Sequence, residues 1–146
     1  MSSRALCLAV AVALMAAAGA AEAAGSVYFT PEASGSTTFV MPSNNVECIF
    51  TPVGGSTVYM PTDGGPELSC DRAIPTYLRF TLNATGPAEV ITDVGDQSCC
   101  GGPNTFAYGM SWRIEPFTCT SATTGLQCRR DDGHGFLISK AKVSAY

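Results

Sequence analysis

The chain has 146 residues, with 8 basic and 12 acidic side chains, one histidine and a formal net charge of −4. A mildly acidic chain without a basic cluster is not typical of nucleic-acid binders, so no nucleic-acid partner is expected. The only basic doublet, Arg129-Arg130, is followed at once by Asp131-Asp132, and this run is predicted to be a solvated turn instead of a phosphate site.

The first 23 residues predict export. Residues 1–4 are short and basic, residues 6–18 are apolar, and Ala21-Glu22-Ala23 has the small-x-small pattern of a cleavage site, so residues 1–23 are interpreted as a secretory signal peptide. The apolar run is too short to span a bilayer, and no second apolar span follows. The mature chain is therefore expected to be secreted or periplasmic, with no membrane span.

The mature chain is predicted to hold one β-rich domain. Residues 24–38 are small and polar and are expected to be a flexible N-terminal segment, with a short strand at Val27-Tyr28-Phe29; residues 39–146 then form the domain. Apolar and polar residues alternate with period two in several later runs. These runs are Val46-Glu47-Cys48-Ile49-Phe50, residues 77–82, residues 106–114 and residues 140–143.

Turn signals separate these runs. Examples are Gly54-Gly55, Asp63-Gly64-Gly65-Pro66 and Gly101-Gly102-Pro103-Asn104. Short alternating strands with frequent turns, and no segment of helical period, predict an all-β fold: a small, disulfide-stapled antiparallel β-sandwich or barrel.

The run at residues 106–114 has the strongest alternation. Its apolar positions are Phe106, Tyr108, Met110, Trp112 and Ile114. Because Trp112 shares its parity with apolar neighbours, the aromatic residues are predicted to belong to the core and not to a ligand-stacking surface.

Six cysteines remain once Cys7 has left with the signal peptide. They are Cys48, Cys70, Cys99, Cys100, Cys119 and Cys128. An even number in an exported chain indicates a disulfide framework, and six cysteines allow 15 pairings. The pairs Cys119 with Cys128 and Cys48 with Cys70 are local and plausible, because each flanks a segment with turn residues.

The adjacent cysteines leave two alternatives open. Cys99 and Cys100 bond either to each other or to distant partners, which would break up the two local pairs. A bond between neighbours closes almost no loop, so its entropic contribution to stability is near zero. It would be a local shape device or a labile redox group, and CC lacks the spacer of a CxxC redox site.

Few residues suggest chemistry. His134, flanked by Gly133 and Gly135, is the weak catalytic candidate, since with Asp131 or Asp132 and a serine it would complete a triad, but no nucleophile elbow is present. The flanking glycines favour a structural role in a turn. Four carboxylates are scattered without a pairing pattern: Glu47, Glu67, Glu89 and Glu115. No cofactor-binding fingerprint occurs, and no cofactor or metal is expected.

Six short motifs occur in the order PSNNVEC, LSCD, AYGMSW, FTCTS, GLQC and DGHGF. Together they resemble a family of small secreted bacterial proteins of unknown function, over residues 39–146. The resemblance implies the pairs Cys48–Cys70 and Cys119–Cys128. Asn44 stands where the family usually has glycine, and asparagine is the residue best suited after glycine to a left-handed turn.

The family also carries a middle cysteine pair that this chain lacks. The matching places are residues 74–77 and 93–96, and neither has a cysteine. The resemblance thus implies that Cys99 and Cys100 bond to each other.

The functional prediction is a non-enzymatic module that binds a partner through its loops. That partner would be a protein or a cell-envelope component. The alternatives are a small hydrolase that uses His134 and a thiol-redox protein that uses Cys99 and Cys100.

Overall fold

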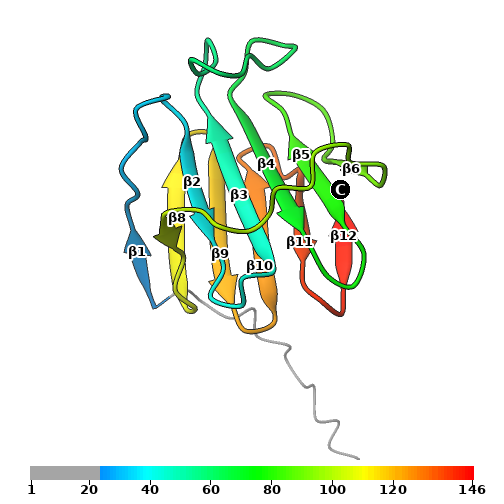
Figure 1. The fold of residues 1–146 in the computed structure, drawn as a ribbon. Helices are drawn as coiled ribbons and strands as arrows, with labels where there is room; N and C mark the ends of the chain where they lie inside the picture. Colours follow the sequence, from blue (N-terminus) through cyan, green and yellow to red (C-terminus); the bar gives the residue numbers. More distant parts are fainter. Residues whose placement is uncertain (1–23) are drawn as a thin grey trace, which may run out of the picture.

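The computed structural model describes residues 24–146, so the signal peptide expected at residues 1–23 lies outside the described part. Two six-stranded sheets face each other and are not closed into a barrel (Figure 1). The all-β prediction is confirmed, and the architecture is the sandwich. Among the described residues no helix is long and apolar enough to cross a membrane.

The first sheet, sheet A, contains the two ends of the described chain. Its strands lie in the order β1 (Gly25–Val27), β8 (Met110–Ile114), β9 (Phe117–Ala122), β10 (Gly125–Arg130), β11 (Gly135–Ile138) and β12 (Val143–Ala145). Neighbours are antiparallel except β1 and β8, which are parallel.

The second sheet, sheet B, carries the site described below. Its strands lie in the order β6 (Glu89–Ile91), β5 (Leu78–Leu82), β4 (Glu67–Arg72), β3 (Val46–Thr51), β2 (Thr37–Val40) and β7 (Asn104–Thr105). Only β2 and β7 are parallel. Because β6 and β7 lie at opposite edges, residues 92–103 cross the outer face of the sheet (Figure 1). We call residues 92–103 the crossing segment.

Alternation along the strands builds the core. In a strand successive side chains point to opposite faces, and Leu78, Phe80 and Leu82 of β5 all face inward and are buried. The inner faces of both sheets contribute large side chains to one cluster. Its fully buried members include Phe39, Leu68, Phe80, Phe106, Trp112, Phe117, Leu126, Phe136 and Ile138.

The folded unit begins before the boundary expected at residue 39. Gly25–Val27 pairs with β8, and Phe29 is buried, with its ring centroid 5.4 Å from that of Phe39. β2 itself begins at Thr37. Residues 24–38 are therefore part of the domain, because one apolar ring and one strand of this segment complete the sandwich.

The aromatic run at residues 106–114 is not one strand. β7 ends at Thr105 and β8 begins at Met110, and the intervening chain turns at Gly109, which has a φ of 81°. Phe106 and Trp112 lie in the core as predicted, but Tyr108 is exposed. The period-two pattern was wrong here because it extended through a turn.

Two disulfides occupy the centre of the core and confirm the expected local pairs. Cys48–Cys70 joins directly opposite residues of β3 and β4, and Cys119–Cys128 does the same for β9 and β10. The sulfurs of Cys48, Cys70 and Cys128 lie within 4.8 Å of one another. The two bridges therefore meet across the sandwich.

Two predictions about turns have different outcomes. Asn44 adopts a φ of 50°, so the left-handed conformation expected at this position is present. The solvated turn expected at Arg129-Arg130 is wrong for Arg130, which is 4% exposed. Its guanidinium donates to the Asn83 and Gly86 carbonyls and to the Asp132 carboxylate, so it connects the two sheets.

Candidate functional site

The outer face of sheet B forms a groove of about 820 Å³. The strands of the sheet supply its floor, because their polar residues alternate with the core residues and point outward. The β3–β4 loop, residues 52–66, contributes one wall through Val58 and Tyr59. The crossing segment contributes the other through Asp96 and Ser98.

The strand register arranges the floor in rows. One row, near the crossing segment, holds Glu47, Asp71, Arg79 and Ile91 on β3, β4, β5 and β6. The next row holds Ile49, Ser69, Thr81 and Glu89 on the same strands. At the far end Thr51 pairs with Glu67. These rows run across the strands. Each row contains at least one acidic side chain.

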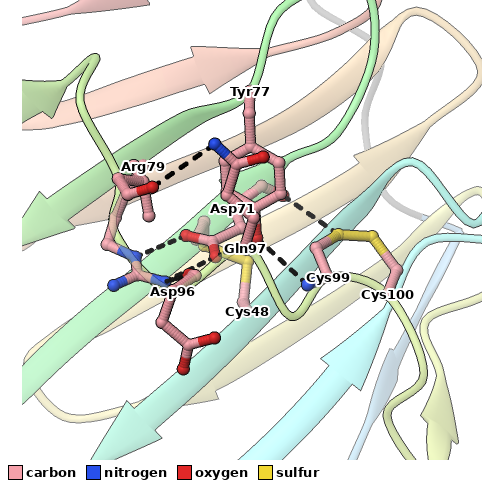
Figure 2. A network of polar contacts seen from close by, with 10 residues as sticks. Cys48, Asp71, Tyr77, Arg79, Asp96, Gln97, Cys99 and Cys100 are labelled. Atoms are coloured by element: carbon pink, nitrogen blue, oxygen red, sulfur yellow. Dashed lines mark hydrogen bonds and ion pairs between the residues drawn. A yellow bond between two sulfur atoms is a disulfide. The ribbon is translucent and has the colours of Figure 1, made fainter.

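A partly buried ion pair fixes the end next to the crossing segment. Arg79 donates to both oxygens of Asp71 at 2.7 Å, and the Tyr77 hydroxyl donates to Asp71 at 2.6 Å (Figure 2). Hydrogen bonding to Asp71 raises the pKa of Arg79. Burial, together with the same carboxylate, raises the pKa of Tyr77. Asp71 is thus held as a paired carboxylate.

The crossing segment is anchored on this network. The Cys99 backbone N–H donates to the Tyr77 hydroxyl at 3.0 Å (Figure 2). The N–H groups of Gly101 and Gly102 both donate to one oxygen of Glu47 at 2.6 Å. A carboxylate that accepts two backbone N–H groups is a strong, charge-assisted anchor. Glu47 therefore holds the wall against the floor.

Cys99 and Cys100 are bonded to each other within this wall. The two residues are half-buried, and the Sγ atom of Cys99 lies 3.8 Å from the carbonyl oxygen of Asp71 (Figure 2). The vicinal bond directly precedes Gly101 and Gly102, whose N–H groups point at Glu47. Its position is the one expected of a bond that fixes the local conformation of the backbone.

Glu67 lies at the opposite end of the groove. It is only 7% exposed, and the Tyr59 hydroxyl donates to its Oε2 atom at 3.1 Å. Burial raises the pKa of the Glu67 carboxyl. No described residue donates to Oε1 of Glu67, and no fully enclosed side-chain oxygen in residues 24–146 lacks a partner. Oε1 therefore opens into the groove.

The floor between the two ends combines hydroxyl and apolar groups. Thr51 and Thr81 are more than nine-tenths buried and line the groove. Because no fully enclosed side-chain oxygen in residues 24–146 lacks a partner, any of these hydroxyls, or that of Ser69, that is not bonded within the protein is open to the groove. Ile49 is 41% exposed at the centre of the floor. These groups offer hydrogen bonds and an apolar contact to a bound molecule.

Charge is strongly concentrated in the groove. Residues 24–146 contain eleven carboxylates and seven basic side chains, and the lining includes seven of the carboxylates but one basic group, Arg79. The seven are Glu32, Glu47, Asp63, Glu67, Asp71, Glu89 and Asp96. The groove thus carries a net −6 while the rest of the described chain carries +2.

His134 lies outside the groove, in the turn between β10 and β11. Its carbonyl accepts from the Arg130 N–H, and its own N–H donates to Asp132, so the backbone closes the turn. The neighbouring acids are already engaged, since Asp131 is bonded to Arg113 and Asp132 to Arg130.

The described residues contain one cluster with the spacing of metal ligands, namely the sulfurs of Cys48, Cys70 and Cys128. All three are disulfide-bonded. Metal ligation by cysteine needs a thiolate, so this cluster serves the core and not a metal ion.

Three of the four scattered carboxylates come together in the groove. Glu47, Glu67 and Glu89 line it, whereas Glu115 does not. The sequence carried part of this signal, because Glu47 and Glu67 alternate with core residues and so had to face outward. The sequence did not show that these strands are neighbours in one sheet.

Comparisons with known proteins do not identify this chain. No family model, no curated protein and no solved structure matches it. The functional conclusion therefore depends on the chemistry of the groove itself.

Proposed function

We propose that this protein is an exported, non-enzymatic binding module whose ligand lies in the groove on sheet B. The observation that carries the proposal is the set of largely buried polar side chains, Thr51, Glu67 and Thr81, that line one groove. No fully enclosed side-chain oxygen or nitrogen in residues 24–146 lacks a partner, so the free polar atoms of this set are accessible from the groove. A surface that retains several such groups is suited to supplying them to a partner.

The expected place of action is outside the cytoplasm. Three disulfides indicate an oxidising environment, extracellular or periplasmic. The signal-peptide pattern of residues 1–23 supports secretion or periplasmic location, and the motif resemblance supports a place among small secreted bacterial proteins. The partner class that fits this location is a protein or an envelope component.

Binding is better supported than either catalytic alternative. A hydrolase that uses His134 lacks a free orienting acid in the turn, because Asp131 and Asp132 are bonded to arginines. A redox protein needs an accessible thiolate, and Cys99 and Cys100 are half-buried in a wall that Glu47 anchors.

A ligand screen followed by nuclear magnetic resonance tests the proposal. Basic, acidic and neutral soluble oligomers are added to the labelled protein, and the shifted amide signals are mapped. We expect shifts at the groove floor, and we expect Ile49→Trp to abolish them by filling its centre. Val90→Trp is the matched control, since Val90 is similarly exposed on β6 but does not line the groove. Binding that maps elsewhere, or that survives Ile49→Trp, contradicts the proposal.

A further inference from the structure

We infer that the ligand of the groove is an extended basic peptide, whose lysine or arginine side chains contact the groove carboxylates. This inference rests on the proposed function and deepens it by naming the chemistry of the ligand. Three independent features of the groove support it: the separation of charge, the open carboxylate of Glu67, and the size and composition of the floor.

The concentration of negative charge in the groove favours a cationic ligand. The groove holds a net −6, while the remaining described residues together carry a net +2. A concave surface lined by one sign of charge focuses the field and raises the local concentration of oppositely charged ligands. Only the Asp71 carboxylate is neutralised by a basic side chain, Arg79. An acidic ligand would be repelled by the other six carboxylates of the groove.

Glu67 supplies the strongest single contact. It is a nearly buried carboxylate whose one neutral partner is the Tyr59 hydroxyl, and its Oε1 atom is open to the groove. A carboxylate in this position lacks a counter-charge that an ammonium or guanidinium group would provide. Charge-assisted hydrogen bonds of this kind are stronger than neutral ones. Glu67 is therefore the expected anchor for one basic side chain.

The size of the floor fits an extended chain. Five strands, β2 to β6, span about 19 Å at about 4.8 Å per strand, which accommodates about six extended residues at about 3.3 Å each. Ser69 and Thr81 lie opposite each other on β4 and β5 and line the groove, so their hydroxyls offer hydrogen bonds to a bound peptide backbone. Exposed apolar groups, namely Ile49, Val58, Tyr59 and Ile91, provide contacts that a peptide with aliphatic stems uses and a simple polyamine uses less.

Four probes of different charge and chemistry test the ligand class. They are hexalysine, hexaglutamate, the polyamine spermine and a neutral hexamer of N-acetylglucosamine, each titrated by calorimetry and mapped by nuclear magnetic resonance. We expect hexalysine to bind in the groove and to weaken as salt rises from about 0.01 M to about 0.1 M, where the screening length falls from about 30 Å to about 10 Å. Hexaglutamate should not bind there, and spermine should bind more weakly.

Two matched variants test the anchor. Glu67→Gln removes the charge but keeps an acceptor for Tyr59, and we expect hexalysine affinity to fall at least about tenfold. Glu115→Gln removes a carboxylate that is 86% exposed and lies outside the groove, and it should leave affinity unchanged. Equal losses in both variants would indicate general charge attraction and overturn the assignment of Glu67 as anchor.

The outcomes separate this inference from the proposed function. If the neutral hexamer binds in the groove, is blocked by Ile49→Trp, and hexalysine does not bind, the basic-peptide inference is wrong while the binding function stands. If spermine binds as tightly as hexalysine, the ligand chemistry is a polyamine and the peptide is excluded. If hexalysine binds only outside the groove, the basic-peptide inference fails, and if none of the four probes binds in the groove, the proposed function fails with it.

Discussion

Two adjacent glycines of the crossing segment differ in how much space surrounds their Cα atoms. A Cβ atom at Gly102 would lie 2.7 Å from Cγ2 of Thr38, whereas one at Gly101 would meet nothing within 4 Å. Both N–H groups donate to Glu47. The absence of a side chain at Gly102 therefore allows the crossing segment to lie close enough to the floor for both N–H groups to reach Glu47.

We expect Gly102→Ala to lower the free energy of unfolding by about 1–3 kcal/mol, because the clash with Thr38 forces the segment away from Glu47. Gly101→Ala is the control and should stay within about 0.5 kcal/mol of the wild type. Urea denaturation of both variants measures the difference. If the two alanines have the same effect, the contact of Gly102 with the floor does not position the wall.

The raised pKa of Glu67 also leads to a prediction about how the stability of the fold depends on pH. Burial raises the pKa of its carboxyl above the ordinary value of 4.5, and the groups that face it are Tyr59, Asp63, Arg79 and Glu89. The folded state thus holds this proton more tightly than the unfolded chain does. Ionised Glu67 destabilises the fold at neutral pH, and this penalty disappears as pH falls through the raised pKa.

We therefore expect Glu67→Gln to be more stable than the wild type at neutral pH and to lose this advantage below pH 4.5. Denaturant unfolding at several pH values measures it, with Glu115→Gln as the control. A variant that is less stable at neutral pH contradicts the cost assigned to this carboxylate. A cost to the fold at a residue of the proposed binding site would be an example of the compromise between stability and function.

At the scale of elements, Arg130 connects β10 of sheet A with the connection between β5 and β6 of sheet B. Its buried guanidinium donates to the carbonyls of Asn83 and Gly86 and to the Asp132 carboxylate. Because Asp132 is half exposed, its share of the stabilisation is small. The two carbonyl contacts carry most of the effect.

Arg130→Met should lower the free energy of unfolding by about 2–4 kcal/mol, since it removes charged hydrogen bonds from a buried site and leaves carbonyl groups without a donor. Arg129→Met changes the neighbouring, exposed arginine and should have little effect. Thermal and chemical unfolding of the pair compares them. Similar stabilities of the two variants would show that Arg130 does not join the sheets.

At the scale of the whole molecule, the three disulfides do different work. The Cys48–Cys70 and Cys119–Cys128 bridges crosslink the central hairpins of the two sheets and touch each other in the core. The Cys99–Cys100 bridge closes no loop and lies in the wall of the groove. Loop entropy therefore assigns stability to the first two and local shape to the third.

Replacing Cys48 and Cys70 by alanine should cost about 3 kcal/mol or more, while replacing Cys99 and Cys100 should cost less than about 1 kcal/mol. The second variant should instead weaken ligand binding, because the wall loses its fixed position over Glu47 and Asp71. Denaturation and calorimetric titration of both variants measure the two effects. Loss of global stability without loss of binding in the Cys99 and Cys100 variant would reverse the assigned roles.

The sequence predicted much of the strand content from alternation alone. Leu78, Phe80 and Leu82 had to share a face because side chains alternate in any strand, whichever strands lie beside it. The local disulfides and the left-handed Asn44 followed from spacing, from turn chemistry and from the motif resemblance. These features are local, so few assumptions about the rest of the chain were needed.

Other features depended on contacts between distant segments. The burial of Phe29 and the burial of Arg130 each require partners far away in the chain. Local patterns of small, polar or charged residues therefore gave the wrong expectation there.

The groove shows the same division. Alternation alone determined that Glu47 and Arg79 face away from the core, because each lies between two core residues. Only the order of strands in sheet B, and the crossing of its outer face by residues 92–103, decided that these side chains share one hollow. Strand order is set by non-local pairing, and a single strand's pattern of polar and apolar residues carries no record of its neighbours.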